Sequence, residues 1–379
     1  MNTYAQADKA GKGKLLDSLT QTTGWTRDHA RRAIRQAETQ QSAGPRRRKP
    51  KSRKYSDDAM AVLHEVWWLA GQPSGKYLAA VMEDILNRLI RFAELDRVDA
   101  RLTPDVLDEV RAMSPATIDR YLKPYRAGAR SEGIALVKPG QILRPAVHTY
   151  SAAGEQCCAG SLELNAVAHC GGEVRGDFLW TVTVTEPTTG WTLLRTASNG
   201  SVRNVAAAMD WIVESVPLPV AGVVVGKGNE FIRRAVAHWG TERRIAVLQG
   251  PDQCDRHTVS EQADAERGKG HAFRVRYRSE AERLLLDRLW ELSAARRNHL
   301  LPCVKATGWV ESSTGRRRTY DRLRTPYQRL LEQPSLAPTV RARLHHEHEQ
   351  LNPAQITRDI ERIQLELQGH REPGRDLPA

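Results

Sequence analysis

Long apolar segments are missing from this sequence of 379 residues. A helix that crosses a bilayer needs about 20 mostly apolar residues, and the sequence has no apolar run of about that length. The amino-terminal residues are polar, which excludes the apolar centre of a secretory leader. We therefore expect a cytoplasmic protein without a membrane partner.

Cysteine is also scarce. The five cysteines are odd in number and scattered, so a disulfide framework is not expected. Cys157 and Cys158 adjoin one another, and His169 precedes Cys170, but their spacing matches no zinc motif. A structural zinc ion is therefore not expected either.

Acidic residues are in the minority. There are 45 aspartates and glutamates against 57 lysines and arginines, which gives a formal net charge of +12 and a pI of about 9.7. Such a balance attracts polyanions without sequence preference, although by itself it is weak evidence for a nucleic-acid partner. The length allows two to four domains, one of them with a substantial core.

Short apolar runs alternate with helical patterns between residues 160 and 250. Runs rich in valine, threonine and leucine predict strands, and apolar residues three and four positions apart predict helices. We expect strands over residues 162–167, 177–185, 191–196, 220–225 and 244–248, and helices over residues 202–213 and 229–239. This alternation indicates an α/β core.

Three stretches carry a more specific signal. Residues 161–172 read SLELNAVAHCGG, residues 222–232 read GVVVGKGNEFI, and residues 259–262 read VSEQ. They resemble the integrase core of bacterial insertion-sequence transposases, whose pattern is roughly FLExDxVAHCGG, DxDNGSEFIN and xVEQKN. The resemblance implies an RNase H-like domain over residues 160–305, with a mixed sheet flanked by helices.

The resemblance also implies three catalytic positions, which fall on Asn165, Gly226 and Glu261. Between them lie 60 and 34 residues. In intact relatives these positions are carboxylates that hold two Mg²⁺ ions for cleavage and strand transfer of DNA. Here Asn165 has a neutral amide and Gly226 has no side chain, which leaves Glu261 as the one acidic metal ligand of the triad. We therefore expect no productive Mg²⁺ binding.

Two alternatives remain open at this point. One is an active enzyme whose metal site has been rearranged to use Glu163, Asp177 or Asp255. The other is a repressor-like or domesticated protein that binds DNA without cutting it, and a decaying transposase gene would show the same substitutions. The sequence alone does not decide whether the chain is an enzyme.

The first 44 residues predict a helix-turn-helix. Residues 14–20 form an amphipathic pattern, Gly24 provides a turn, and Thr26 can cap a second helix that extends to about Ala37. We expect this second helix to contact DNA through its basic residues, Arg27, Arg31, Arg32 and Arg35. A solvated arginine-rich helix would give the same pattern.

A basic linker follows at residues 45–54. It is too charged and too interrupted by proline to pack, and we expect it to follow the phosphate backbone or minor groove. The alternative is a solvated linker. Its candidate DNA contacts are Arg46, Arg47, Arg48, Lys49, Lys51, Arg53 and Lys54.

A second helical module is expected over residues 55–126. Residues 113–120 read MSPATIDR, which matches the transposase family letter for letter. The resemblance implies another helix-turn-helix in which Thr117, Arg120 and Lys123 face DNA. The competing interpretation is that the module only packs against the catalytic core.

A connector over residues 127–159 and a basic, helical region over residues 306–379 complete the expected organisation. Residues 325–331 match the family motif TPYxRLL, and we expect Asn298 to be structural rather than catalytic. The resemblance implies a transposase of a mobile element that binds its terminal repeats and target as double-stranded DNA. It also implies a homo-oligomer on that DNA, here with catalysis lost.

Overall fold

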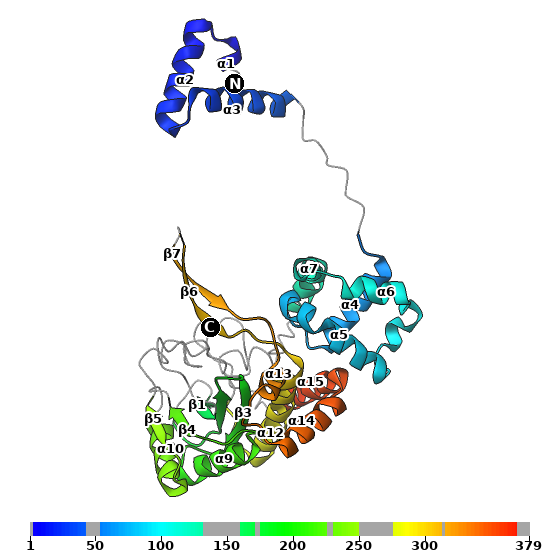
Figure 1. The fold of residues 1–379 in the computed structure, drawn as a ribbon, viewed down its shortest axis with the longest axis vertical. Helices are drawn as coiled ribbons and strands as arrows, with labels where there is room; N and C mark the ends of the chain where they lie inside the picture. Colours follow the sequence, from blue (N-terminus) through cyan, green and yellow to red (C-terminus); the bar gives the residue numbers. More distant parts are fainter. Residues whose placement is uncertain are drawn as a thin grey trace. The chain divides into compact units, whose positions relative to one another are not determined.

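The computed structural model describes residues 3–42, 54–131, 160–170, 175–225, 230–249, 276–312 and 315–369. The chain divides into two units, Met1–Lys54 and Tyr55–Ala379 (Figure 1). Across the described ranges, none of the helices combines the length and apolar character needed to span a bilayer.

The first unit consists of helices joined by tight turns, namely α1 (Thr3–Gln6), α2 (Lys9–Thr23) and α3 (Arg27–Ser42). Gly24 ends α2 with a φ of 70°, a left-handed conformation that glycine adopts at little cost. The Thr26 hydroxyl accepts the N–H of His29 at 3.3 Å at the start of α3. The predicted turn and cap are confirmed. Among the described residues of this unit, Leu16 and Ala30 are the buried apolar ones.

The second unit begins with a helical layer: α4 (Asp57–Leu69), α5 (Gly75–Arg91), the 3₁₀ helix η1 (Asp96–Arg101), α6 (Pro104–Arg111) and α7 (Pro115–Ser131). The expected boundary at residue 127 differs from the structure, because α7 continues through Pro124 to Ser131. An ion pair of 2.7 Å between Asp119 and Arg126 spans the proline and supports the helix on either side of it.

A five-stranded mixed sheet follows, with the order β3-β2-β1-β4-β5. Its strands are β1 (Ser161–Ala168), β2 (Trp180–Glu186), β3 (Trp191–Ala197), β4 (Gly222–Val225) and β5 (Val247–Gln249). The pairs β1–β2 and β2–β3 are antiparallel, whereas β1–β4 and β4–β5 are parallel. The chain is therefore of the α/β class, as expected.

Helices cover both faces of this sheet. Val182 and Val184 of β2 belong to one core with α9 (Val202–Ser215) and α10 (Glu230–Arg243). Thr181, whose side chain points to the other face, accepts a hydrogen bond of 3.0 Å from Trp290 of α12 (Glu280–Ala295).

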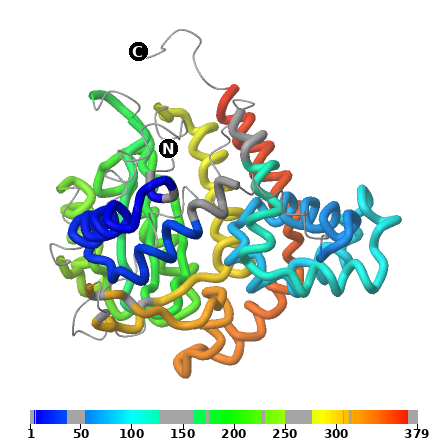
Figure 2. The backbone as a smooth tube through the Cα atoms, turned by 90° about the horizontal axis from the view of Figure 1, so that it is seen from above, coloured from blue at the N-terminus to red at the C-terminus, as the bar shows by residue number. Residues whose placement is uncertain are grey.

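The carboxyl-terminal part contains a π-helical turn, a hairpin and three further helices in the described ranges. These are η4 (Arg296–Leu300), β6 (Ala306–Ser312), β7 (Gly315–Tyr320), α13 (Pro326–Leu331), α14 (Pro338–Gln350) and α15 (Pro353–Gly369). α12 and α15 share one hydrophobic core with α4, α5, α6 and α7, and Figure 2 shows the red α15 next to the blue and cyan helices. Residues 55–126 therefore have no separate core among the described residues.

Candidate functional site

The parallel pairing of β1 with β4 positions the first of the three candidate catalytic residues. Leu164 of β1 pairs with Val225, the last residue of β4, and Asn165 follows Leu164 directly. The carboxyl end of β4 therefore lies beside Asn165. Gly226 comes next in the sequence, and both it and Glu261 lie outside the described residues.

A second polar residue shares the sheet face of Asn165. Side chains alternate along a strand, so Glu163 and Asn165 point to one face and Leu162 and Leu164 to the other. The Oε1 atom of Glu163 is buried and has no hydrogen-bond partner among the described residues. Burial, followed by the charge of Glu186, raises the pKa of Glu163 to about 7.

These donors do not fit a pair of Mg²⁺ ions. Magnesium prefers ionised oxygen ligands, but Asn165 is neutral, and burial followed by the charge of Glu186 disfavours the ionised form of Glu163. Asp177 is exposed ahead of β2, and Asp255 lies outside the described residues. Within the described ranges, no three His, Cys, Asp or Glu side chains gather as a metal site.

His169 is buried and hydrogen-bonded within the fold. It is 1% exposed, its Nε2 lies 2.7 Å from the Thr181 hydroxyl, and burial lowers its pKa to about 4. Its backbone N–H and C=O bond to Leu179 and Tyr277. Cys170 follows in a bridge to Arg276, while Cys157 and Cys158 lie outside the described residues.

The MSPATIDR motif divides into residues that build the fold and residues that face outward. Met113 and Ile118 are buried in the core. Asp119 accepts the N–H of Gly75 at 2.8 Å and so caps the start of α5. A side chain at Gly75 would come within 2.4 Å of the Pro115 carbonyl oxygen, so α5 and α7 meet too closely there for a larger residue.

The three predicted DNA contacts of α7 lie on the outward part of the helix. Arg120 and Lys123 are exposed, and Thr117 is half-buried with its hydroxyl 3.0 Å from that of Ser114. The Arg120 guanidinium lies over the Tyr121 ring at 5.3 Å. The structure therefore brings these side chains together on one accessible surface, at the start of the second helix after a short turn.

The arginines of α3 also share a surface. Arg27, Arg31 and Arg35 are spaced four residues apart on the helix, Arg32 lies beside them, and all four are exposed. Arg27 pairs with Asp17 at 2.6 Å, with more than half of each side chain exposed. Exposed pairs of this kind contribute little to stability, so these guanidinium groups can exchange partners.

The basic linker falls almost entirely outside the described residues. This applies to the candidate contacts Arg46, Arg47, Arg48, Lys49, Lys51 and Arg53. Lys54 is described, and its side chain is exposed just before α4.

Asn298 and residues of the TPYxRLL motif are structural. The Asn298 side chain is buried and pairs with the Thr192 backbone of β3, accepting its N–H at 3.0 Å and donating to its carbonyl at 2.8 Å. This agrees with the predicted structural role. In the TPYxRLL motif, Thr325 and Gln328 form a capping box at the start of α13, and Leu330 is fully buried.

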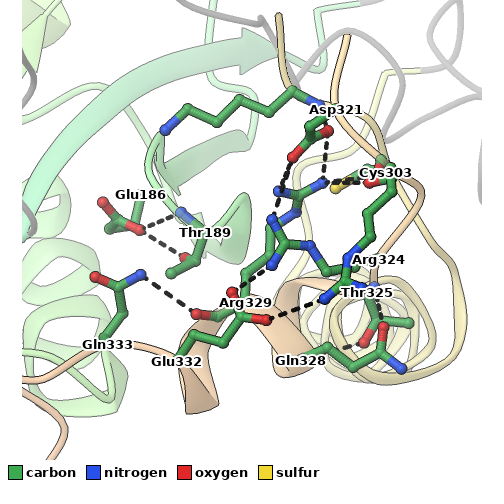
Figure 3. Close-up of polar contacts among 12 residues, drawn as sticks. Glu186, Thr189, Cys303, Asp321, Arg324, Thr325, Gln328, Arg329, Glu332 and Gln333 are labelled. Carbon is green, nitrogen blue, oxygen red and sulfur yellow. Dashed lines mark hydrogen bonds and ion pairs between the residues drawn. The ribbon is translucent and has the colours of Figure 1, made fainter. Parts of the chain in front are cut away.

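A polar cluster at the base of the β6–β7 hairpin had no role in the sequence-based interpretation (Figure 3). The Asp321 carboxylate, just after β7, accepts bonds of 2.5 and 3.1 Å from Arg329, and one of 2.7 Å from the Lys305 N–H. Burial alone would raise the pKa of Asp321, but the Arg329 and Lys305 bonds lower it to about 2.

Comparison with known proteins adds a distant relative. The chain is 27% identical over 251 residues to the uncharacterized protein y4rM of Sinorhizobium fredii, an alignment that covers 65% of this chain and 68% of that protein. No protein-family model matches the chain.

Proposed function

We propose that this chain is a DNA-binding protein of the integrase-core transposase type that has lost DNA cleavage and strand transfer. The observation that carries the proposal is the pairing of β1 with β4. In a sheet of order β3-β2-β1-β4-β5, this pairing puts Asn165 beside the carboxyl end of β4, where an RNase H-like enzyme needs its first two ligands together.

The loss of catalysis rests on the chemistry of the ligand positions. Asn165 and Gly226 contribute no negative charge, so of the three positions only Glu261 has a carboxylate. At an effective dielectric constant near 20, each carboxylate lost about 4 Å from a divalent ion forfeits on the order of 8 kcal/mol before solvation compensates. No metal-dependent step is derived for this chain.

Double-stranded DNA is the proposed partner, bound by a homo-oligomer. The exposed arginines of α3 and the group Thr117, Arg120 and Lys123 of α7 support this, because each lies on a helix that follows a short turn. The net charge of +12 supports it as well.

Binding and nicking of a duplex that carries the element's terminal repeat test the proposal. We expect anisotropy titrations to show affinity that falls steeply with KCl and weakens when residues 1–54 are deleted. We expect no nicking with Mg²⁺ or Mn²⁺, and recovery of strand transfer when Asn165→Asp and Gly226→Asp are combined. Binding that ignores salt, or no binding, would reject DNA as the partner.

An active enzyme with a rearranged site is the second candidate. It is favoured by one observation, the buried Glu163 oxygen without a partner on the face of Asn165. This candidate predicts nicking by the unmodified chain in Mn²⁺ that disappears in Glu163→Gln and persists in the exposed-site control Glu214→Gln. Absence of nicking in the unmodified chain would exclude it.

A further inference from the structure

The β6–β7 hairpin is a two-stranded ribbon whose strands pair only with each other among the described residues. Val310 pairs with Arg317 and Trp309 with Arg318, and a bulge lies between Ala306 and Gly308. An isolated two-stranded ribbon is marginally stable in water. A ribbon of this kind therefore requires either firm anchoring or a partner.

The ribbon exposes apolar and aromatic surface. Trp309 is 45% exposed, Val310 54% and Tyr320 50%. In contrast, Trp67 and Trp239 are buried in the cores of this unit. Trp309 and Val310 are consecutive in β6 and therefore point to opposite faces, so the ribbon exposes apolar side chains on both faces.

The ribbon is also basic. Residues 305–322 contain five basic residues and two acidic ones, and residues 316–318 are three consecutive arginines. Of the two acidic residues, Asp321 accepts hydrogen bonds from Arg329 and from the Lys305 N–H. Guanidinium groups stay charged at any pH at which the protein is folded, so the ribbon matches a polyanion.

The base of the ribbon is fixed. Asp321 binds Arg329 of α13, and Arg324 binds Asp321 at 3.3 Å and also contacts Glu332 (Figure 3). The side chain of Arg329 is 4% exposed, and α13 is seated in the core through Tyr327 and Leu330. These contacts anchor the base of the hairpin to α13. An anchored ribbon loses less conformational entropy on binding than a freely moving one.

We propose that the β6–β7 ribbon is an arm that binds the phosphates of duplex DNA through its basic residues, with Asp321 and Arg329 as the positioning pair. The proposal rests on the proposed function and adds a contact surface to it. The major groove is about 12 Å wide and admits a two-stranded ribbon, which makes duplex DNA the partner that fits both the charge and the shape.

The test compares two triple variants of the full chain that remove equal charge. The ribbon variant combines R316Q, R317Q and R318Q; the control combines R288Q, R343Q and R362Q, exposed arginines of α12, α14 and α15. Anisotropy is titrated with a duplex at several KCl concentrations. The association constant K falls as KCl rises, so the slope of log K against log [KCl] is negative. We expect the absolute value of this slope to decrease by about 3 for the ribbon variant and to change little for the control.

If the ribbon variant keeps the salt slope of the unmodified chain, the proposal that the ribbon binds DNA is refuted, while the proposed function remains intact. Failure of the unmodified chain to bind duplex DNA would overturn both. Binding of single-stranded RNA that depends on the ribbon, without binding of duplex DNA, would also refute the proposal that the ribbon binds duplex DNA. The single variant Arg317→Glu, at an exposed position, guards against misfolding: it is expected to weaken binding at an unchanged melting temperature.

Discussion

At the scale of single residues, the face of β1 that carries Asn165 combines burial with unsatisfied polarity. Glu163 is directly opposite Thr185 of β2, yet its Oε1 has no partner among the described residues. A carboxyl oxygen that is buried without a partner is tolerated when the group is protonated, because the charged form loses hydration there. Its ionisation therefore opposes folding.

Replacing this group tests that conclusion. The pKa of Glu163 is about 7 in the folded chain and 4.5 ordinarily, so the folded state binds more protons between these values. The cost of ionising Glu163 is absent below pH 4.5, grows as the pH rises to about 7 and then levels off. We expect Glu163→Gln to raise the melting temperature at pH 8 and to have less effect at pH 5.

Scanning calorimetry at both pH values measures this difference. Glu214→Gln, at an exposed position of α9, is the matched control and is expected to leave the melting temperature unchanged at both. An equal effect of Glu163→Gln at pH 5 and pH 8 would contradict the assignment.

Asn298 gives a second prediction at this scale. Its amide satisfies both the N–H and the C=O of Thr192 in a buried position. We expect Asn298→Ala to lower the free energy of unfolding by on the order of 3 kcal/mol, because two buried backbone groups lose their partner. Urea denaturation measures the loss, and a change below about 0.5 kcal/mol, the range of ordinary surface substitutions, would refute the structural role.

At the scale of elements, the sequence predicted the strands and helices that have clear periodicity. The run of valines at residues 220–225 led to β4, and the pattern of residues 202–213 led to α9. The hairpin of β6 and β7 was not predicted, because its strand sequences, ATGWVES and GRRRTY, show no alternation of apolar and polar residues. Its two strands are stabilised by pairing with each other and by the Asp321 cluster, which single-sequence patterns do not contain.

The candidate site was predictable to a similar extent. The position of Asn165 beside the end of β4 follows from the family pattern and spacing, and the register agrees with it. In contrast, the raised pKa of Glu163 depends on its burial where β2 pairs with β1, and on the charge of Glu186, 23 positions later in the chain. Such a property depends on three-dimensional neighbours, so no local pattern could indicate it.

The motif at the start of α7 offers a prediction that separates its two functions. Asp119 caps α5, whereas Arg120 is exposed. We expect Asp119→Ala to lower stability by about 1–2 kcal/mol with the salt dependence of DNA binding retained. We expect Arg120→Gln to decrease the absolute value of the slope of log K against log [KCl] by about 1, at an unchanged free energy of unfolding.

Denaturation curves and anisotropy titrations of the same two preparations provide both readouts. If Arg120→Gln binds DNA with the slope of the unmodified chain, α7 serves packing alone. This would favour the competing interpretation, in which residues 55–126 only support the core.

At the scale of the whole second unit, polar contacts tie the early helices to the late ones. Arg88 of α5 donates to the His348 carbonyl at 2.6 Å, and its guanidinium lies 2.6 Å from the His348 ring nitrogen Nε2. Because a guanidinium can only donate, His348 is neutral and accepts through Nε2. The His348 ring stacks on Tyr327 and His299. Acidification therefore disturbs a junction between segments far apart in the sequence.

The final prediction concerns this junction. Burial first, then repulsion from His348 once it is protonated and from Arg88, lowers the pKa of His299 to about 3 from an ordinary 6.5. The unfolded chain takes up a proton below 6.5 while the folded chain does not, so this stability is complete above pH 6.5 and declines as the pH falls. We expect His299→Phe, which keeps an aromatic ring against Trp191 and Tyr327, to reduce the loss of melting temperature between pH 7 and pH 5. His346→Gln, at an exposed position of α14, is the control and is expected to melt with the pH dependence of the unmodified chain. Identical pH profiles for all three proteins would contradict the prediction, because His299 would then ionise as freely in the folded chain as in the unfolded one.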